Sequence, residues 1–266
     1  MQRATPIEEI LKRDRAVVLA GILGIAALAW AYTVYVAWGM KDTMASMNMS
    51  ATMAMPQMQP WTALDFVLMF VMWAVMMMAM MAPTAAPMIL VFATVTRKRK
   101  EQQRPFVPTG VFLSGYVAIW SGFALVATLA NWGLHTGGLL SSMVGSAAPV
   151  VGGSLLIAAG IFQWSRLKYL CLTHCRSPIG FLMSEWREGP KGALIMGLRH
   201  GAFCLGCCWL LMALLFVLGV MNLLWIAALS AFVLIEKIAP AGRWVSRSTG
   251  LLLVLWGLWT IVGMLA

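Results

Sequence analysis

Long apolar segments alternate with short polar or basic segments along the whole chain of 266 residues. The apolar segments cover about residues 16–39, 61–96, 107–132, 148–165, 193–219, 221–238 and 248–266. A helix of roughly 20 apolar residues is long enough to cross a lipid bilayer. The pattern therefore predicts an all-α fold, a polytopic transmembrane helix bundle of about seven spans. The second segment exceeds one straight crossing, and Pro83 and Pro87 predict a break or kink within it.

The composition agrees with a membrane protein, because 61% of the residues are hydrophobic and only 11% are charged. The net charge of +10 would allow a nucleic-acid partner, but the distribution of the basic residues argues against one. They gather before the first span, at 97–104, at 166–191 and at 237–247, which seven crossings would bring to one side. An excess of Lys and Arg marks the cytoplasmic side of a membrane protein. We therefore expect the N-terminus inside, membrane lipid as a partner, and no nucleic acid.

These observations predict the organisation of the chain. Residues 1–15 form a basic cytoplasmic head, and residues 16–39 form the first span. Residues 40–60 form a methionine-rich extracytoplasmic loop. Residues 61–266 form a six-span membrane domain, and the cysteines described next make it a metal-binding one.

All five cysteines and two of the three histidines lie within 38 residues: Cys171, His174, Cys175, His200, Cys204, Cys207 and Cys208. If 193–219 is helical, His200, Cys204 and either Cys207 or Cys208 share one face. Thiolate and imidazole are standard ligands of Zn(II) and Cu(I). We therefore predict one metal site, with the segment around Pro178 folding back so that its two halves meet. Arg199 is expected to offset thiolate charge or to pair with Glu236.

Methionine is concentrated in two places. The polar segment 40–60 holds seven, and the predicted copper ligands among them are Met44, Met47, Met49, Met53 and Met55. Thioether sulfur is a soft ligand that suits Cu(I), although a compositionally biased linker is the alternative interpretation. In the second span, Met72, Met76 and Met80 form a helical stripe that serves either ligation or packing. Asp65, in the first turn of that helix, is either a cap or a functional carboxylate.

Four sequence runs resemble a bacterial family described as predicted metal-binding integral membrane proteins. They are WAVMMMAMMAPTAAP at 73–87, CLTHCRSP at 171–178, GLRHGAFCLGCCWLLM at 197–212 and IEKIAPAG at 235–242. The most specific is the His-Gly-x-x-Cys-x-Gly-Cys-Cys-Trp motif at 200–209. The resemblance implies a multi-pass metal-binding protein of the bacterial inner membrane. The methionine spacings are separately similar to those of eukaryotic copper-uptake transporters.

Together these features favour the handling of a soft metal, copper(I) with zinc as the alternative, for transport, delivery or insertion. The metal would pass from the outer methionines along the stripe to the Cys/His cluster. One rival is a membrane thiol oxidoreductase that uses Cys204 and Cys207, and another is a structural subunit of a larger complex. The sequence has no phosphate-binding loop, so ATP-driven pumping by this chain alone is not expected. A membrane subunit or a periplasmic copper protein is the expected partner.

Overall fold

The structure, a computed structural model, describes residues 6–50, 61–103, 107–138, 149–239 and 242–265. For 6–15, 17, 40–50, 100, 149 and 264–265 that description covers the backbone alone. Within the described residues every regular element is an α-helix, which confirms the predicted all-α class. The elements are α1 (Pro6–Ser50), α2 (Ala63–Glu101), α3 (Thr109–Thr136), α4 (Pro149–Phe162), α5 (Arg166–Arg176), α6 (Pro178–Glu185), α7 (Gly189–Ala213), α8 (Leu215–Leu218), α9 (Leu223–Ile238) and α10 (Gly242–Leu265).

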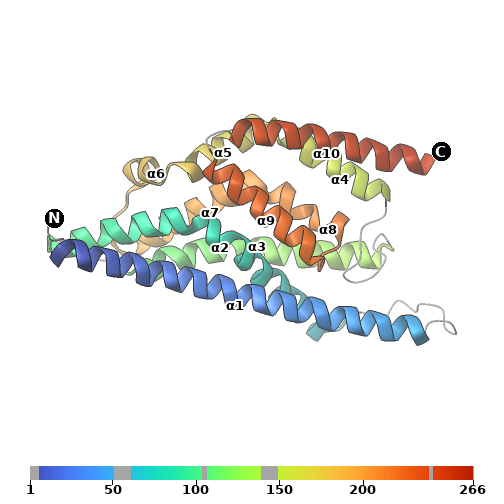
Figure 1. Cartoon of the computed structure of the whole chain (residues 1–266), viewed down its shortest axis with the longest axis horizontal. Coiled ribbons are helices and arrows are strands. Elements are labelled where there is room, and N and C mark those ends of the chain that lie inside the picture. The colour runs from blue at the N-terminus through green and yellow to red at the C-terminus, as the bar shows by residue number, and fades with distance from the viewer. Residues whose placement is uncertain (1–5, 51–60, 104–106, 139–148, 240–241, 266) are drawn as a thin grey trace, which may run out of the picture.

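The long helices lie along one axis, and the chain reverses direction at each end of the bundle (Figure 1). Helix α1 begins at one end of that axis and α10 finishes at the other (Figure 1). Five helices are long and apolar enough to cross a membrane: Val18–Gly39, Ala63–Arg99, Thr109–Thr136, Gly189–Leu218 and Gly242–Gly263. Helices α4 and α5, bent by 64° at a short break, would together make a sixth. Helix α9 has 16 residues and is shorter than these candidate spans, so the count of about seven spans and the orientation stay predictions.

Two helices differ from the sequence prediction in a way that has a local cause. Helix α1 continues to Ser50, so residues 40–50 of the predicted loop are helical; they contain neither Pro nor Gly. Helix α2 runs unbroken through Pro83 and Pro87 and changes direction along its length (Figure 1).

At the start of α2, the Asp65 carboxylate accepts hydrogen bonds from the Thr62 N–H (2.9 Å) and hydroxyl (2.7 Å). Asp65 therefore caps the helix, as one of the two interpretations proposed.

The segment 166–191, which separates two of the predicted spans, is mostly helical. The Ser165 hydroxyl caps α5 by accepting from the Lys168 N–H at 3.1 Å, and Pro178 occupies the first turn of α6. Helix α5 packs on α7, which brings CLTHC beside HGAFCLGCC. The fold-back that the metal-site prediction required is thus present.

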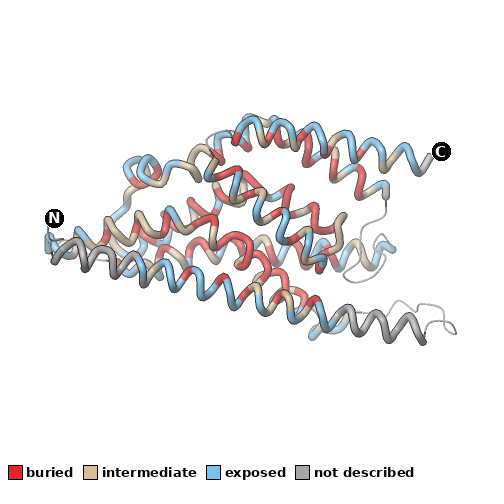
Figure 2. Tube along the Cα trace, in the orientation of Figure 1, coloured by how far each residue is buried: buried red, intermediate tan, exposed pale blue. Residues whose placement is uncertain are grey.

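Helix α7 lies against α3 at a distance that only glycine allows. A Cβ on Gly197 would overlap the Phe112 carbonyl oxygen, and one on Gly115 would overlap the Leu194 carbonyl oxygen. Close backbone approach at small residues is a common means of helix association in lipid. The buried residues concentrate on the facing sides of α2, α3 and α7 (Figure 2). The cysteines of α7 therefore lie in the most enclosed part of the bundle.

Candidate metal centre

The centre is built around the sulfur of Cys204, a residue of α7 that is only 1% exposed. The Lys237 ammonium, from α9, donates a hydrogen bond to this sulfur at 3.0 Å. The Tyr116 hydroxyl, from α3, lies 3.2 Å from the same sulfur and 3.1 Å from the Met81 carbonyl oxygen of α2. Side chains from α3, α7 and α9 therefore meet at one thiol, and α2 is joined to them through the Tyr116 hydroxyl. An adjacent ammonium balances negative charge on this sulfur, which is the environment of a metal-binding or reactive cysteine.

The four other thiols come from α5 and α7. The thiols of Cys207 and Cys208 each donate to the Cys204 carbonyl oxygen at 3.0 Å. The Cys175 side chain, from α5, has hydrogen-bond contacts with the Cys204 and Cys207 side chains. Cys171 packs over Gly206, where a Cβ would stand 2.8 Å from its sulfur. All five cysteines are free, so the region offers thiols for ligation.

The two predicted histidine ligands lie in different surroundings. His200 is 3% exposed, one turn before Cys204, and its ring lies among those of Phe112, Tyr116 and Phe181. Among the described residues its Nδ1 has no hydrogen-bond partner, which costs free energy and leaves this buried nitrogen open to a ligand. His174 instead stacks on Phe203 with ring centroids 4.3 Å apart, and its Nδ1 contacts the Leu170 carbonyl oxygen at 2.9 Å. The structure thus places His200 with the thiols and turns His174 to a different environment.

The charges of the site differ from the prediction. Arg199 pairs with Glu185 at the bundle surface, and buried Glu236 pairs with Lys168 at 2.6 Å. The expected pairing of Arg199 with Glu236 is therefore wrong, because the two residues find partners on other helices. Lys237 holds the position beside the thiols that Arg199 was expected to fill.

Sequence reasoning missed Lys237 and Tyr116 as members of the site. Lys237 is buried, and its ammonium also donates to the Thr84 hydroxyl at 2.9 Å. An ionisable residue at membrane depth is a functional candidate by default, and Lys237 follows Glu236 in an otherwise apolar helix. That signal was available in the sequence. Tyr116 carried no comparable signal, since a tyrosine in an apolar helix is ordinary.

The methionines fall into two groups. Met72, Met76 and Met80 are at most 3% exposed and belong to the core. Their stripe leads along α2 toward Thr84, which contacts Lys237. Met44, Met47 and Met49 lie where only the α1 backbone is described, and Met53 and Met55 lie outside the described residues.

Among the described residues, no group of three or more His, Cys, Asp or Glu side chains is already arranged to hold a metal ion. The hydrogen bonds from Cys207 and Cys208 to the Cys204 backbone give the reason, since they direct both thiols along their own helix. Rotation of a thiol about its χ1 bond would release it, because these bonds are weak. The arrangement can thus present two sulfurs without change to the backbone, whereas a four-ligand shell would require rearrangement.

A family model described as PpoB2, copper chaperone, matches residues 70–260. The chain belongs to this family of copper chaperones. The match covers 191 of the 266 residues, from α2 into α10, and contains every cysteine together with Tyr116, His200 and Lys237. This match agrees with the sequence runs, which resembled a metal-related family. No match was found among curated proteins or among solved structures.

Proposed function

We propose that this copper chaperone is an integral membrane protein that binds Cu(I) at Cys204, inside the helix bundle, and passes it to a partner. The side chains of Cys175 and Cys208 contact that of Cys204, and His200 is the imidazole one turn away. The observation that carries the proposal is the convergence of an ammonium, a phenol and neighbouring thiols on one buried sulfur. Packing needs alone do not explain a lysine at this depth.

Charge favours Cu(I) bound by two thiolates over Zn(II) bound by four thiolates at this position. A Cu(I) ion bound by two thiolates carries a net charge of −1, which the Lys237 ammonium offsets. A Zn(II) ion bound by four thiolates carries −2 and keeps an unpaired negative charge. Because an uncompensated charge is costly in a buried site, the single lysine matches the copper complex.

The methionine stripe supplies a route toward the cysteines. Met72 and Met80 lie on α2 about 12 Å apart along the helix axis, from the rise of a helix over eight residues. The stripe ends beside Met81, whose carbonyl oxygen accepts from the same Tyr116 hydroxyl that contacts Cys204. Thioethers bind Cu(I) more weakly than thiolates, so copper that enters among the methionines would move toward the cysteines. We propose that Met44, Met47, Met49, Met53 and Met55 capture copper at the start of this route.

Burial separates copper binding from thiol oxidoreductase activity. Thiol–disulfide exchange requires a sulfur that a partner's sulfur can attack. Cys204, Cys207 and Cys208 are at most 1% exposed, so a protein disulfide cannot reach them. A bare metal ion needs much less access. Cys175 is half-buried and lies at the boundary of the cluster, which makes it the candidate for release to a partner membrane subunit.

Copper binding by purified protein tests the proposal. The protein is loaded with Cu(I) or Zn(II) in detergent, freed of excess metal, and its metal content is measured by mass spectrometry. We expect Cu(I) to be retained by wild type and by Trp209→Phe, which alters an exposed neighbour on α7, and to be lost by Cys204→Ser. Equal retention of zinc, or equal copper in Cys204→Ser, would contradict the proposal.

A further inference from the structure

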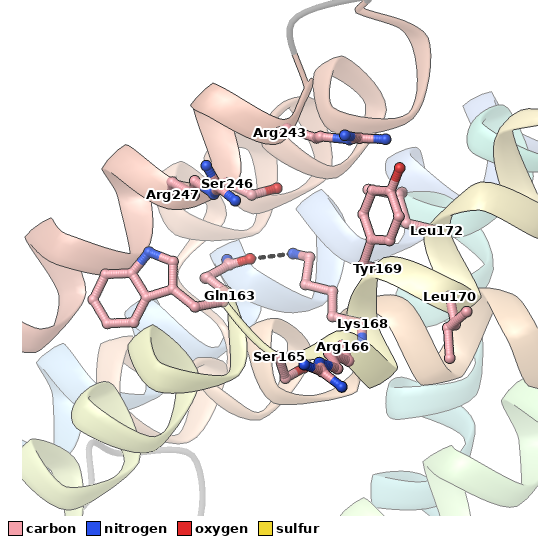
Figure 3. A pocket seen from close by; sticks show the side chains of 11 residues that line it. Gln163, Ser165, Arg166, Lys168, Tyr169, Leu170, Leu172, Arg243, Ser246 and Arg247 are labelled. Carbon is pink, nitrogen blue, oxygen red and sulfur yellow. Dashed lines mark hydrogen bonds between the residues drawn. The ribbon is translucent and has the colours of Figure 1, made fainter.

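A pocket of about 410 Å³ lies between the α4–α5 break and the first turns of α10, apart from the metal centre. Figure 3 shows Arg243, Ser246 and Arg247 of α10 facing Gln163, Lys168 and Tyr169 across it. The remaining lining residues include Arg166 and Trp164. The pocket is thus lined by basic and aromatic side chains from two sides.

The positive charge of this pocket is largely uncompensated. Four basic residues line it, and one of them, Lys168, is neutralised by its 2.6 Å pair with buried Glu236. Among the described residues, no ion pair is formed by Arg166, Arg243 or Arg247. The Arg243 guanidinium lies 4.3 Å from the centroid of the Tyr169 ring, which orients it without altering its charge. Three guanidinium groups therefore remain available to an anion.

A buried donor in the same pocket lacks an acceptor. Gln163 is 5% exposed, and its Oε1 accepts from the Lys168 ammonium. Its Nε2 is buried and finds no hydrogen-bond partner among the residues that the structure describes. A buried N–H group without an acceptor is costly, and native structures satisfy nearly all of them. A ligand with acceptor oxygens would satisfy this group and pair with the arginines at once.

We propose that this pocket binds a phosphate-bearing anion, and that the phosphate is the head group of an anionic membrane lipid. The lipid source follows from the surface of α10. Arg243 and Arg247 are followed on the same helical face by Leu251 and Leu255, which are 53% and 54% exposed. A lipid whose phosphate binds the arginines would thus place its acyl chains along an exposed apolar stripe. Basic pockets between helices at the cytoplasmic side are typical of anionic head-group binding, and the lipid source rests on the proposed membrane location.

Lipid retention tests the proposal. Full-length protein in detergent is incubated with phosphatidylglycerol or phosphatidylcholine, and bound lipid is counted by native mass spectrometry. We expect wild type to prefer phosphatidylglycerol. Each basic residue near a membrane surface contributes about a fivefold change in binding, so R243Q/R247Q should weaken phosphatidylglycerol binding roughly 25-fold. The matched control K98Q/K191Q removes two exposed charges outside the pocket and should leave binding unchanged.

A competition arm identifies the source of the phosphate. If inorganic phosphate at millimolar concentration fails to displace phosphatidylglycerol, the anion is a lipid head group; if it displaces the lipid, the same site serves a soluble phosphate. Equal binding of the two lipids by wild type, or an equal loss in the control double variant, would overturn the proposal. Copper content measured on the same samples should be unchanged in R243Q/R247Q, so this test fails or succeeds independently of the metal centre.

Discussion

Replacement of Lys237 by methionine isolates the electrostatic part of copper binding. The substitution keeps a long unbranched side chain but removes the ammonium that lies 3.0 Å from the Cys204 sulfur. The Thr84 hydroxyl, which accepts from Lys237, still donates to the Met81 carbonyl oxygen at 2.9 Å. No buried donor is therefore stranded, and we expect the variant to fold.

The magnitude follows from the charge that Lys237 offsets. A Cu(I) ion held by two thiolates has a net charge of −1. Opposite unit charges about 4 Å apart attract by about 4 kcal/mol at the effective dielectric constant typical of proteins. Since about 1.4 kcal/mol corresponds to a factor of ten, the Cu(I) dissociation constant should rise up to about 10³-fold in Lys237→Met.

Competition against a coloured Cu(I) chelator measures this change. The control is the double variant Lys168→Met/Glu236→Gln, which removes a buried lysine together with its partner and leaves the Cys204 contacts in place. Its dissociation constant should match that of wild type. If Lys237→Met is folded and its dissociation constant rises by less than about threefold, Lys237 does not offset the charge of bound copper.

Three further predictions follow from the described contacts. His200→Ala should weaken Cu(I) binding about tenfold or more, as the loss of a ligand or of its neighbour does, whereas His174→Ala should leave binding unchanged. Equal effects of the two substitutions in a chelator titration would refute the assignment of His200, rather than His174, to the site. Gly197→Ala should destabilise the protein by about 1–3 kcal/mol, because the added methyl group overpacks against α3. Gly122→Ala, which has open space around it, should melt at the same temperature as wild type; coincident melting curves of both variants and wild type would contradict this prediction. Met76→Leu should keep stability within about 1.5 kcal/mol but slow copper uptake in proteoliposomes, and unchanged uptake would assign the stripe to packing alone.

The fold class was predictable because membrane helices leave a strong signal of length and hydropathy. The helical state of 166–176 was not, because CLTHC is short and polar for a span, and its helix depends on the Ser165 cap and on packing against α7. The extension of α1 to Ser50 also escaped prediction, since a polar composition suggested a loop although no helix breaker is present.

The thiols of the centre were predictable from helical spacing and from their confinement to one region. The partners of those thiols were not, because they come from distant helices. Tyr116 reaches Cys204 from 88 residues away and Lys237 from 33 residues away. The partner of Arg199 was predicted wrongly for the same reason. Its position next to His200 in the sequence suggested a role in charge balance at the cluster, but in the folded chain it forms an ion pair with Glu185.

X-ray absorption spectroscopy of the copper-loaded protein tests the central claim most directly, since it reports the oxidation state and the ligand atoms of the metal together. The account predicts Cu(I) with sulfur neighbours in wild type, and loss of that signal in Cys204→Ser with Cys171→Ser little changed. Copper bound only through oxygen and nitrogen in wild type, or an identical sulfur signal in Cys204→Ser, would contradict it.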